Sequence, residues 1–520
     1  MKLSKIEFEK TNKFSSIFLD YVQNKKELQK HYAFPPNIES FEEAISNRNF
    51  DDGKREVLVK TLKDQYKDIS EHELVSGNIE LLNQKNTFTI TTGHQLNIFT
   101  GPLFFIYKIV ATINMAKMLK EKYASYNFIP VYWMASEDHD FAEINNFKLF
   151  GKKFVWESEQ KGPVGRFETK SMTSLLDEVM EKPGFITDSY LNCSNLSEAT
   201  RCIVHELFGD HGLVILDADE YVFKHEFKSV IINEILHNKA HELVQTSTTH
   251  LKGLGYKSQI FPRPINFFYM EDGLRERIEK VDGIFKVKNT SLTFTEEEIE
   301  ALIDEHPEKF SPNVVLRPVY QEVILPNLAY IGGPAEVSYW LQLKSVFDYY
   351  NVAFPVLFPR NFVMIITKAI ARKMEKLNLI EKDVFKSFSI LKEELLYKDT
   401  EPIHDLTLQL NEIEKVFEYI KTKANALDKS LEGFVMSEFK KTEKSLGNIQ
   451  NRLKRAEEQK QEVSIKQLEG ILEKLFPGGN PQEREDNFLN FYINNPDFIN
   501  ELIDHLDPFD LKYNILREDG

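Results

Sequence analysis

Three stretches of the sequence place glycine and polar residues where a buried strand ends, a position suited to chemistry. The first, ITTGHQLNIFTGP, sets His94 and Gln95 between an apolar run and a Gly-Pro step. A glycine-rich turn between strand and helix leaves backbone N–H groups at the carboxyl edge of the sheet, where ligands and anions bind. We expect Thr100 to cap the next helix, with Pro102 in its first turn. Capping does not require His94 and Gln95, so we predict ligand contacts there; the alternative is that they brace the loop.

The second stretch, PVYWMASEDHDFAEINN, ends a run of bulky residues in a charged cluster. Ionisable groups at the end of a parallel strand are costly unless they are used. Asp140 and Glu143 have the spacing of a helix N-terminus, and we expect both to act as caps. Glu137, Asp138 and His139 could orient a substrate ammonium or hydroxyls, act as acid or base, or bind a metal. Their spacing matches no standard metal site.

The third stretch, VVLRPVYQEVILPNLAYIGGPAEVSYWLQLK, contains a second Gly-Pro step before a helix. In both steps a tyrosine follows the proline by five residues: Gly101, Pro102 and Tyr107 in one, and Gly333, Pro334 and Tyr339 in the other. Two turns of one design predict two sites for phosphate- or carboxylate-sized groups that face one cleft.

Two arginines stand beside prolines at the edges of apolar runs. A guanidinium in such a place can bind a carboxylate or phosphate through two parallel hydrogen bonds. Arg317 and Arg360 are therefore candidate ligand contacts, and a surface salt bridge is the alternative for each.

Composition limits the class of protein. The formal charge of −16 over 520 residues argues against a nucleic-acid partner. The N-terminus has no secretory signal, and the apolar stretches are too short for a membrane span. Cys193 and Cys202, the two cysteines, fit no zinc or redox spacing, so we expect a reduced cytoplasmic protein whose thiols are ordinary packing or surface residues.

The order of the predicted elements indicates an α/β fold. NTFTITT and NFIPVYWMAS are strand-like and enclose a helical run, which is the pattern of parallel strands joined by a right-handed crossover. Two Asp-Gly turns within NFFYMEDGLRERIEKVDGIFKV indicate an inserted hairpin. Thr295 and Glu298 have the spacing of a capping box. We therefore predict a doubly wound parallel sheet with inserted segments.

The last third of the chain is helical. Apolar residues alternate steps of three and four from Leu406 to Leu431, the register slips near Gly433, and the pattern then resumes as far as Ala456. Such a stripe indicates a coiled coil. One unbroken helix over 403–457 would be roughly 80 Å long. It would need a partner helix, from residues 370–397 or 462–475 or from a second chain, and we favour dimerisation over an internal hairpin.

We therefore expect four segments. They are an N-terminal helical segment (1–85), an α/β core (86–365) with insertions at about 150–210 and 240–312, a helical coiled-coil region (366–476), and a tail (477–520) that packs on the body.

Taken together, TTGHQLNIFTGPLFFIYK, PVYWMASEDHDFAEINN, SPNVVLRPVYQEVILPNLAYIGGPAEVSYW and PVLFPRNF resemble the cysteine-adding enzymes of bacillithiol biosynthesis, the BshC family. The resemblance implies a Rossmann-like core with inserted connecting segments and a coiled coil that pairs two subunits. It implies the last step of bacillithiol synthesis, in which the carboxyl group of cysteine is joined to the amine of glucosaminyl-malate. The partners would be these two small molecules and a second copy of the chain, with no membrane.

The family motifs also suggest roles for single residues. We take Asp138, His139 and His94 as catalytic candidates, with His94 expected to vary in the family. The acidic cluster would hold the ammonium of cysteine, a neutral histidine would take the proton of the attacking amine, and arginine would face malate or phosphate. The expected substrate-binding residues are Gly93, Gln95, Thr100, Gly101, Pro102, Trp133, Glu137, Arg317, Gln321, Glu322, Gly333, Pro334, Glu336, Tyr339 and Arg360.

The energy source follows only from the chemistry. An amide forms from a free carboxylate after activation, hence with ATP or another nucleotide, although the sequence has no P-loop. Two other interpretations stay open. One is a nucleotidyltransferase-like, adenylate-forming enzyme with another acceptor. The other is a ligand-binding coiled-coil adaptor, against which the crowding of Gly, Pro, His, Asp and Arg at strand ends argues.

Overall fold

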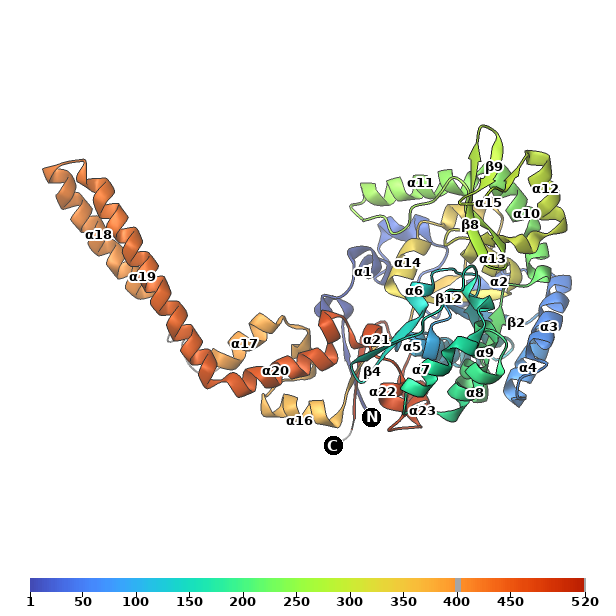
Figure 1. Cartoon of the computed structure of the whole chain (residues 1–520), viewed down its shortest axis with the longest axis horizontal. Coiled ribbons are helices and arrows are strands. Elements are labelled where there is room, and N and C mark those ends of the chain that lie inside the picture. The colour runs from blue at the N-terminus through green and yellow to red at the C-terminus, as the bar shows by residue number, and fades with distance from the viewer. Residues whose placement is uncertain (398–403, 519–520) are drawn as a thin grey trace. The chain divides into compact units, whose positions relative to one another are not determined.

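The computed structural model describes residues 1–397 and 404–518 (Figure 1). The chain divides into two compact units. Residues 1–364 and 481–516 form the first, and residues 365–480 with the chain end from Arg517 form the second. No helix in the described part of the chain is long and apolar enough to cross a membrane.

The first unit is built on a five-stranded sheet whose strands are all parallel. In spatial order the strands are β13 (Val356–Pro359), β12 (Asn327–Gly332), β2 (Thr87–His94), β3 (Asn127–Met134) and β6 (Val214–Asp217). The chain runs outward from β2 to β6 and then returns to build β12 and β13 on the other side of β2. This confirms the predicted doubly wound fold and puts its switch point, the usual ligand position, between β2 and β12.

The strand register brings the sequence motifs together. Gly93 pairs with Trp133 across β2 and β3, and Gly332 pairs with Pro359 across β12 and β13. Because all these strands point the same way, the loops that follow them leave from one edge of the sheet. Sequence segments more than two hundred residues apart therefore meet at the switch point.

Helix α5 (Phe104–Lys122) covers β2 and β3 and is buried along most of its length. Its Ala111 and Met115 pack with Phe88, Ile90 and Phe358 in the core. The N-terminal helices contact the same sheet: α2 (Ser40–Asn47) meets β12 and β13, whereas α3 (Asp52–Tyr66) and α4 (Glu73–Leu81) meet β6. A short strand, β1 (Lys2–Ile6), precedes them and pairs with β15 (Tyr513–Arg517).

Two insertions interrupt the sheet. The first carries α6 (Phe141–Ile144), β4 (Asn146–Leu149), β5 (Lys152–Val155), α7 (Thr173–Glu178), α8 (Gly184–Asn192) and α9 (Leu196–Phe208). The second follows β6 and carries α10 (Tyr221–His237), α11 (Lys239–Gly253), β7 (Phe267–Glu271), β8 (Leu274–Val281), β9 (Ile284–Val287), β10 (Thr293–Phe294), α12 (Glu296–Glu305) and β11 (Phe310–Pro312). The hairpin strands β7, β8 and β9 and the capping box of Thr295 and Glu298 are both confirmed.

The second unit is helical. It contains α16 (Lys368–Lys376), α17 (Phe388–Tyr397), α18 (Thr407–Leu427), α19 (Leu431–Lys460) and α20 (Glu462–Leu475). Helices α16 and α17 pack against α20, and α18 packs against α19 as a hairpin (Figure 1).

The apolar stripe does not lie on one unbroken helix but on the two helices α18 and α19. Asp428 has extended backbone angles, and its carboxylate accepts the Ser430 N–H at 2.8 Å, so the chain reverses between α18 and α19. The register slip near Gly433 comes just after this turn, inside α19. Phe417 and Phe439 meet across the hairpin, so the partner of the stripe is its own second half and not residues 370–397 or 462–475. Dimerisation stays a prediction.

Candidate functional site

A cavity of about 580 Å³ opens at the switch point of the sheet. The ends of β2, β3 and β12, the start of α5, and helices α13 (Arg317–Ile324) and α14 (Pro334–Trp340) form its walls. The structure brings most of the predicted site residues together here: Gly93, His94, Gln95, Trp133, Asp138, Arg317, Gln321, Gly333, Pro334, Glu336, Tyr339 and Arg360. Its size suits a drug-sized or metabolite-sized ligand.

Asp138 is the centre of an ionic network on one wall. Its carboxylate accepts two hydrogen bonds from the Arg317 guanidinium, one of them 3.2 Å long, and one of 3.4 Å from Gln95 Nε2. Burial raises the pKa of Asp138, but Arg317 and Arg275 outweigh that effect and hold the pKa below its usual value. Asp138 is therefore an ionised, oriented acceptor, which suits binding better than proton transfer.

The residues after Asp138 depart from the predicted caps. Asp140 stands at the N-cap of α6, but its side chain makes no capping hydrogen bond. Glu143, expected to be a cap, lines the cavity and accepts a 2.9 Å hydrogen bond from Gln95 Nε2. Helix α6 is a single turn, so there is little N-terminus to cap, and Glu143 is left to hold Gln95.

The cavity is also lined by a lysine that sequence reasoning missed. Lys108 Nζ donates to the Gly93 carbonyl at 2.8 Å and pairs with Glu336 at 2.6 Å. Glu336 also accepts the Gly333 N–H and the Tyr330 hydroxyl, each at 2.7 Å, and so links the ends of β2 and β12. Burial lowers the pKa of Lys108, and Glu336 opposes that shift. A lysine within the apolar run FFIYKIVATI was the available signal.

Arg360 forms a buried ion pair and not the surface salt bridge considered as the alternative. Its guanidinium donates to Glu483 at 2.6 and 3.0 Å, and the side chains are 1% and 3% exposed. Glu483 also accepts the Val363 N–H at 3.1 Å. The partner comes from more than a hundred residues along the chain, so no local pattern could predict it. Arg484, the next residue, lines the cavity.

His94 lies at the end of β2 between Phe104 and Phe105. Burial, together with Lys108 and Arg360, lowers its pKa well below the ordinary value, so the ring is neutral near pH 7. Its Nε2 is buried and has no hydrogen-bond partner among the residues that the structure describes. A neutral imidazole that lines a cavity can accept a hydrogen bond from a ligand through its unprotonated nitrogen.

Two of the predicted ionic residues point elsewhere. Glu137 is buried and pairs with Lys224, which also donates to the Phe310 carbonyl at 2.8 Å. His139 accepts a 2.7 Å hydrogen bond from Arg275, and burial and Arg275 lower its pKa. Neither lines the cavity. Both connect the strand end to the second insertion, because burial of a charged group requires a partner.

The loop after β2 is built differently from the expected cap. Thr100 has φ +66° and Gly101 has φ +63°, and α5 begins only at Phe104, so Thr100 does not cap it. A Cβ on Gly101 would lie 2.6 Å from Asn97, so a side chain does not fit there. Asn487 holds the loop by donating to the carbonyls of Phe99 and Gly101 at 2.7 and 2.6 Å. Thr100, Gly101 and Pro102 therefore shape the backbone of the loop and lie outside the cavity.

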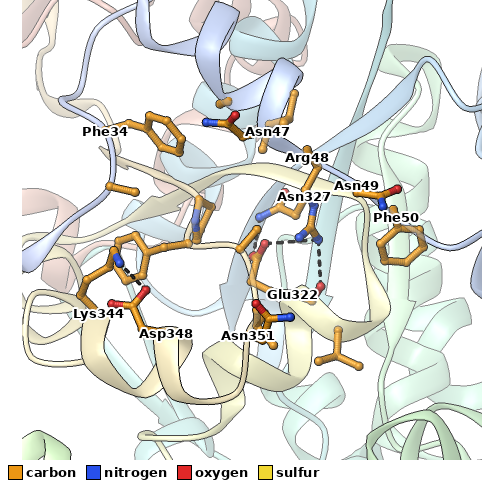
Figure 2. A pocket seen from close by; sticks show the side chains of 18 of the residues that line it. Phe34, Asn47, Arg48, Asn49, Phe50, Glu322, Asn327, Lys344, Asp348 and Asn351 are labelled. Atoms are coloured by element: carbon orange, nitrogen blue, oxygen red, sulfur yellow. Dashed lines mark hydrogen bonds and ion pairs between the residues drawn. The ribbon is translucent and has the colours of Figure 1, made fainter.

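Glu322 lines a second pocket of about 610 Å³ (Figure 2). The Glu322 carboxylate lies 3.8 Å from the Arg48 guanidinium. It also accepts hydrogen bonds from Asn327 at 2.7 Å and from Gln321 at 3.0 Å. Burial raises its pKa to about 7. Asn327 begins β12, so this pocket is at the other edge of the sheet, away from the loops that carry the motifs. The cavity at the carboxyl edge is therefore the stronger candidate.

Metal-ligand geometry is not found in the described parts of the chain. Within residues 1–397 and 404–518, no three His, Cys, Asp or Glu side chains lie close enough to hold a metal ion. The charged groups of the cavity are paired instead with arginine, lysine or amide donors.

A doubly wound sheet with a charged cavity at its switch point, on a chain that continues into a long helical hairpin, defines a Rossmann-like protein with a coiled-coil region. Residues 1–361 match the family described as bacillithiol biosynthesis BshC, N-terminal Rossmann-like domain, and residues 363–518 match its C-terminal coiled-coil domain. The chain belongs to the BshC family of bacillithiol biosynthesis.

Curated relatives match almost the whole chain. A protein of Flavobacterium psychrophilum is 43% identical, and the match covers 98% of this chain and 99% of the relative. Proteins of Flavobacterium johnsoniae and Cytophaga hutchinsonii are 42% and 41% identical, with 98% and 97% of this chain covered and 99% and 97% of the relatives. All three carry the name "Putative cysteine ligase BshC".

Proposed function

We propose that this protein is an amide-forming ligase that joins the carboxyl group of cysteine to the amine of glucosaminyl-malate. The names of the relatives support a cysteine ligase. The observation that carries the proposal is the cavity at the switch point, where cationic and anionic side chains face one space. A ligase for these substrates has to bind the ammonium of cysteine and the carboxylates of malate together, and a cavity of one sign of charge would not.

The charged side chains of the cavity suggest how the substrates lie. Arg317 and the rim residue Arg484 suit the malate carboxylates, because guanidinium groups bind carboxylates through paired hydrogen bonds. Glu143 suits the ammonium of cysteine, whereas the Glu336 carboxylate is already paired with Lys108. Asp138 holds Arg317 in place, and Gln95 connects Asp138 to Glu143, so the two charge-binding regions are fixed relative to each other.

His94 is the candidate acceptor for the proton of the attacking amine. The amine attacks as a neutral group and loses a proton as the amide forms. The neutral ring of His94 lines the cavity and can take this hydrogen bond, whereas Asp138 and His139 are engaged by Arg317 and Arg275. We therefore place His94 ahead of Asp138 and His139 as the catalytic candidate.

The carboxyl group of cysteine has to be activated before the amine attacks, and ATP or another nucleotide would supply that activation. The donor set of the cavity fits an anionic group, since Lys108, Arg317 and Arg484 line it together with the backbone of Gly93 and Gly333. Lys108 and the backbone of Gly93 and Gly333 would hold the phosphates, since Arg317 and Arg484 are assigned to malate. The alternative of a coiled-coil adaptor whose α/β head only binds a ligand is weaker, because several ionisable groups with shifted pKa values in one cavity are typical of catalytic sites.

The test is deletion of the gene in its host, followed by mass spectrometry of labelled small thiols and of glucosaminyl-malate. The proposal predicts that bacillithiol disappears and glucosaminyl-malate accumulates, and that the intact gene reverses both changes. Persistence of bacillithiol at the parental level would refute the substrate assignment and favour the adenylate-forming alternative with another acceptor.

A further inference from the structure

The only two cysteines of the chain lie next to each other in the first insertion. Cys193 follows the last residue of α8, and Cys202 is on α9. Their Sγ atoms are 3.5 Å apart, and both side chains are partly exposed. The sequence spacing fits no redox motif, but α8 and α9 pack as a hairpin and bring the thiols together. The expectation of two ordinary packing or surface thiols is therefore incomplete.

The two thiols differ in their electrostatic surroundings. Cys193 donates its S–H to Cys202 Sγ, and this hydrogen bond, with help from Arg201, lowers the pKa of Cys202 against the effect of burial. The same hydrogen bond, and then burial, raise the pKa of Cys193. Since the thiolate is the nucleophile, Cys202 is the sulfur that attacks first, and Cys193 is the one that follows.

We propose that Cys193 and Cys202 are a redox modification site that forms an intramolecular disulfide by reaction with low-molecular-weight disulfides. The Cys202 thiolate attacks one sulfur of R–S–S–R, which gives a mixed disulfide on Cys202 and releases one thiolate. Cys193 then loses its proton and attacks Cys202 Sγ, which releases the second thiolate. In total, two protein thiols and one small disulfide give one protein disulfide and two small thiols.

The local structure lets this bond form with a small movement. The sulfurs have to approach by about 1.5 Å, since a disulfide is about 2.05 Å long. The Cys193 backbone is held on both sides, because its N–H donates to Ser189 at 3.2 Å and its carbonyl accepts from the Thr169 hydroxyl at 3.1 Å. Asn195 caps α9 by accepting the Glu198 N–H. Rotation of the two side chains is then the natural route to bond formation.

The helix pair that carries the two cysteines contacts the loop that follows β2. On α8, three residues before Cys193, the Tyr190 hydroxyl accepts the Phe99 N–H at 2.8 Å. Thr200 and Ile203 of α9 line a small cavity together with Gln95. The modification therefore acts on the helix pair that supports one wall of the candidate site. The inference needs only the two thiols and does not depend on the identity of the ligase substrates.

The experiment treats the reduced full-length protein with cystine as the probe and follows its intact mass. The wild type is expected to lose the mass of two hydrogen atoms, with a cross-linked 193–202 peptide, and to regain it with dithiothreitol. C193S is expected to stop at one added cysteine on Cys202, and C202S to react more slowly than C193S. A wild type that stays reduced, although the urea-unfolded protein reacts, would overturn the proposal. So would a wild type that ends as stable mixed disulfides or as disulfides between chains.

Discussion

The ion pair between Arg360 and Glu483 gives the sharpest prediction, because it is buried and ties the last segment of the first unit to the candidate site. Both side chains are almost fully buried, and three hydrogen bonds converge on the Glu483 carboxylate, two from Arg360 and one from the Val363 N–H. Removing one partner of such a pair leaves an uncompensated buried charge, which costs about 3–5 kcal/mol. We therefore expect Glu483→Ala to lower the free energy of unfolding of the first unit by about 4 kcal/mol.

Urea unfolding followed by tryptophan fluorescence measures this loss in the first unit alone. All three tryptophans, Trp133, Trp156 and Trp340, lie within it. The matched control is Glu178→Ala, because Glu178 of the first unit pairs with Lys152 and both side chains are at least half exposed. An exposed pair contributes about 0–1 kcal/mol, so the control is expected to stay within that range.

A double variant separates loss of the charge partner from loss of packing. Arg360→Met with Glu483→Leu removes both charges at similar volume, and we expect it to recover most of the stability lost in Glu483→Ala. Unfolding of Glu483→Ala at the same urea concentration as Glu178→Ala would refute this prediction. The prediction would also be refuted if the double variant were less stable than Glu483→Ala.

Three further predictions concern other parts of the molecule. The pKa of Glu322 is about 7 in the folded protein and 4.5 for a free side chain, so its contribution to stability is full below pH 4.5 and is lost as the pH rises through 7. Between pH 4.5 and 7 the free energy of unfolding of the wild type should therefore fall by about 3 kcal/mol more than that of Glu322→Gln. Urea unfolding measures this difference, with the exposed Glu300→Gln as the control. Parallel pH profiles of wild type and Glu322→Gln would contradict the prediction. Lys108→Met should lower product formation on the order of a hundredfold, whereas Lys117→Met on the exposed side of α5 should not; equal activities in a mass-spectrometric assay would remove Lys108 from the site. If the helical hairpin pairs two chains, Ile420→Lys on its exposed surface should convert a dimer to a monomer in light scattering, and a monomeric wild type would end the dimer prediction.

Local patterns predicted the sheet and the carboxyl edge that carries the motif loops, because buried strands, Gly-Pro steps and Asp-Gly turns leave signals within a few residues. They did not predict partners. The sequence predicts Arg360 as a ligand contact at the edge of an apolar run, with a surface salt bridge as the alternative. Its partner Glu483 lies more than a hundred residues away, and nothing near either residue indicates the other. Likewise the sequence predicts Glu137 and His139 as site residues at a strand end. In the structure they contact Lys224 and Arg275 of the second insertion and do not line the cavity.

The helical region shows a second limit. The chain reverses at Asp428 in a segment, LDKSLEG, that has no proline and whose glycine comes after the turn. The apolar stripe is the same for one long helix and for two antiparallel ones, so the pattern alone could not distinguish a partner chain from a hairpin. The contact between the two cysteines could not be predicted for the same reason. Two residues nine positions apart become neighbours only once α8 and α9 fold against each other.

The most direct test of the candidate site is a crystal structure of the protein with glucosaminyl-malate. The account predicts that the ligand lies in the cavity at the switch point, with its malate carboxylates on Arg317 or Arg484 and its amine within hydrogen-bond distance of His94. A ligand bound instead in the pocket of Arg48 and Glu322, or no bound ligand at a concentration that saturates the enzyme in cells, would contradict it.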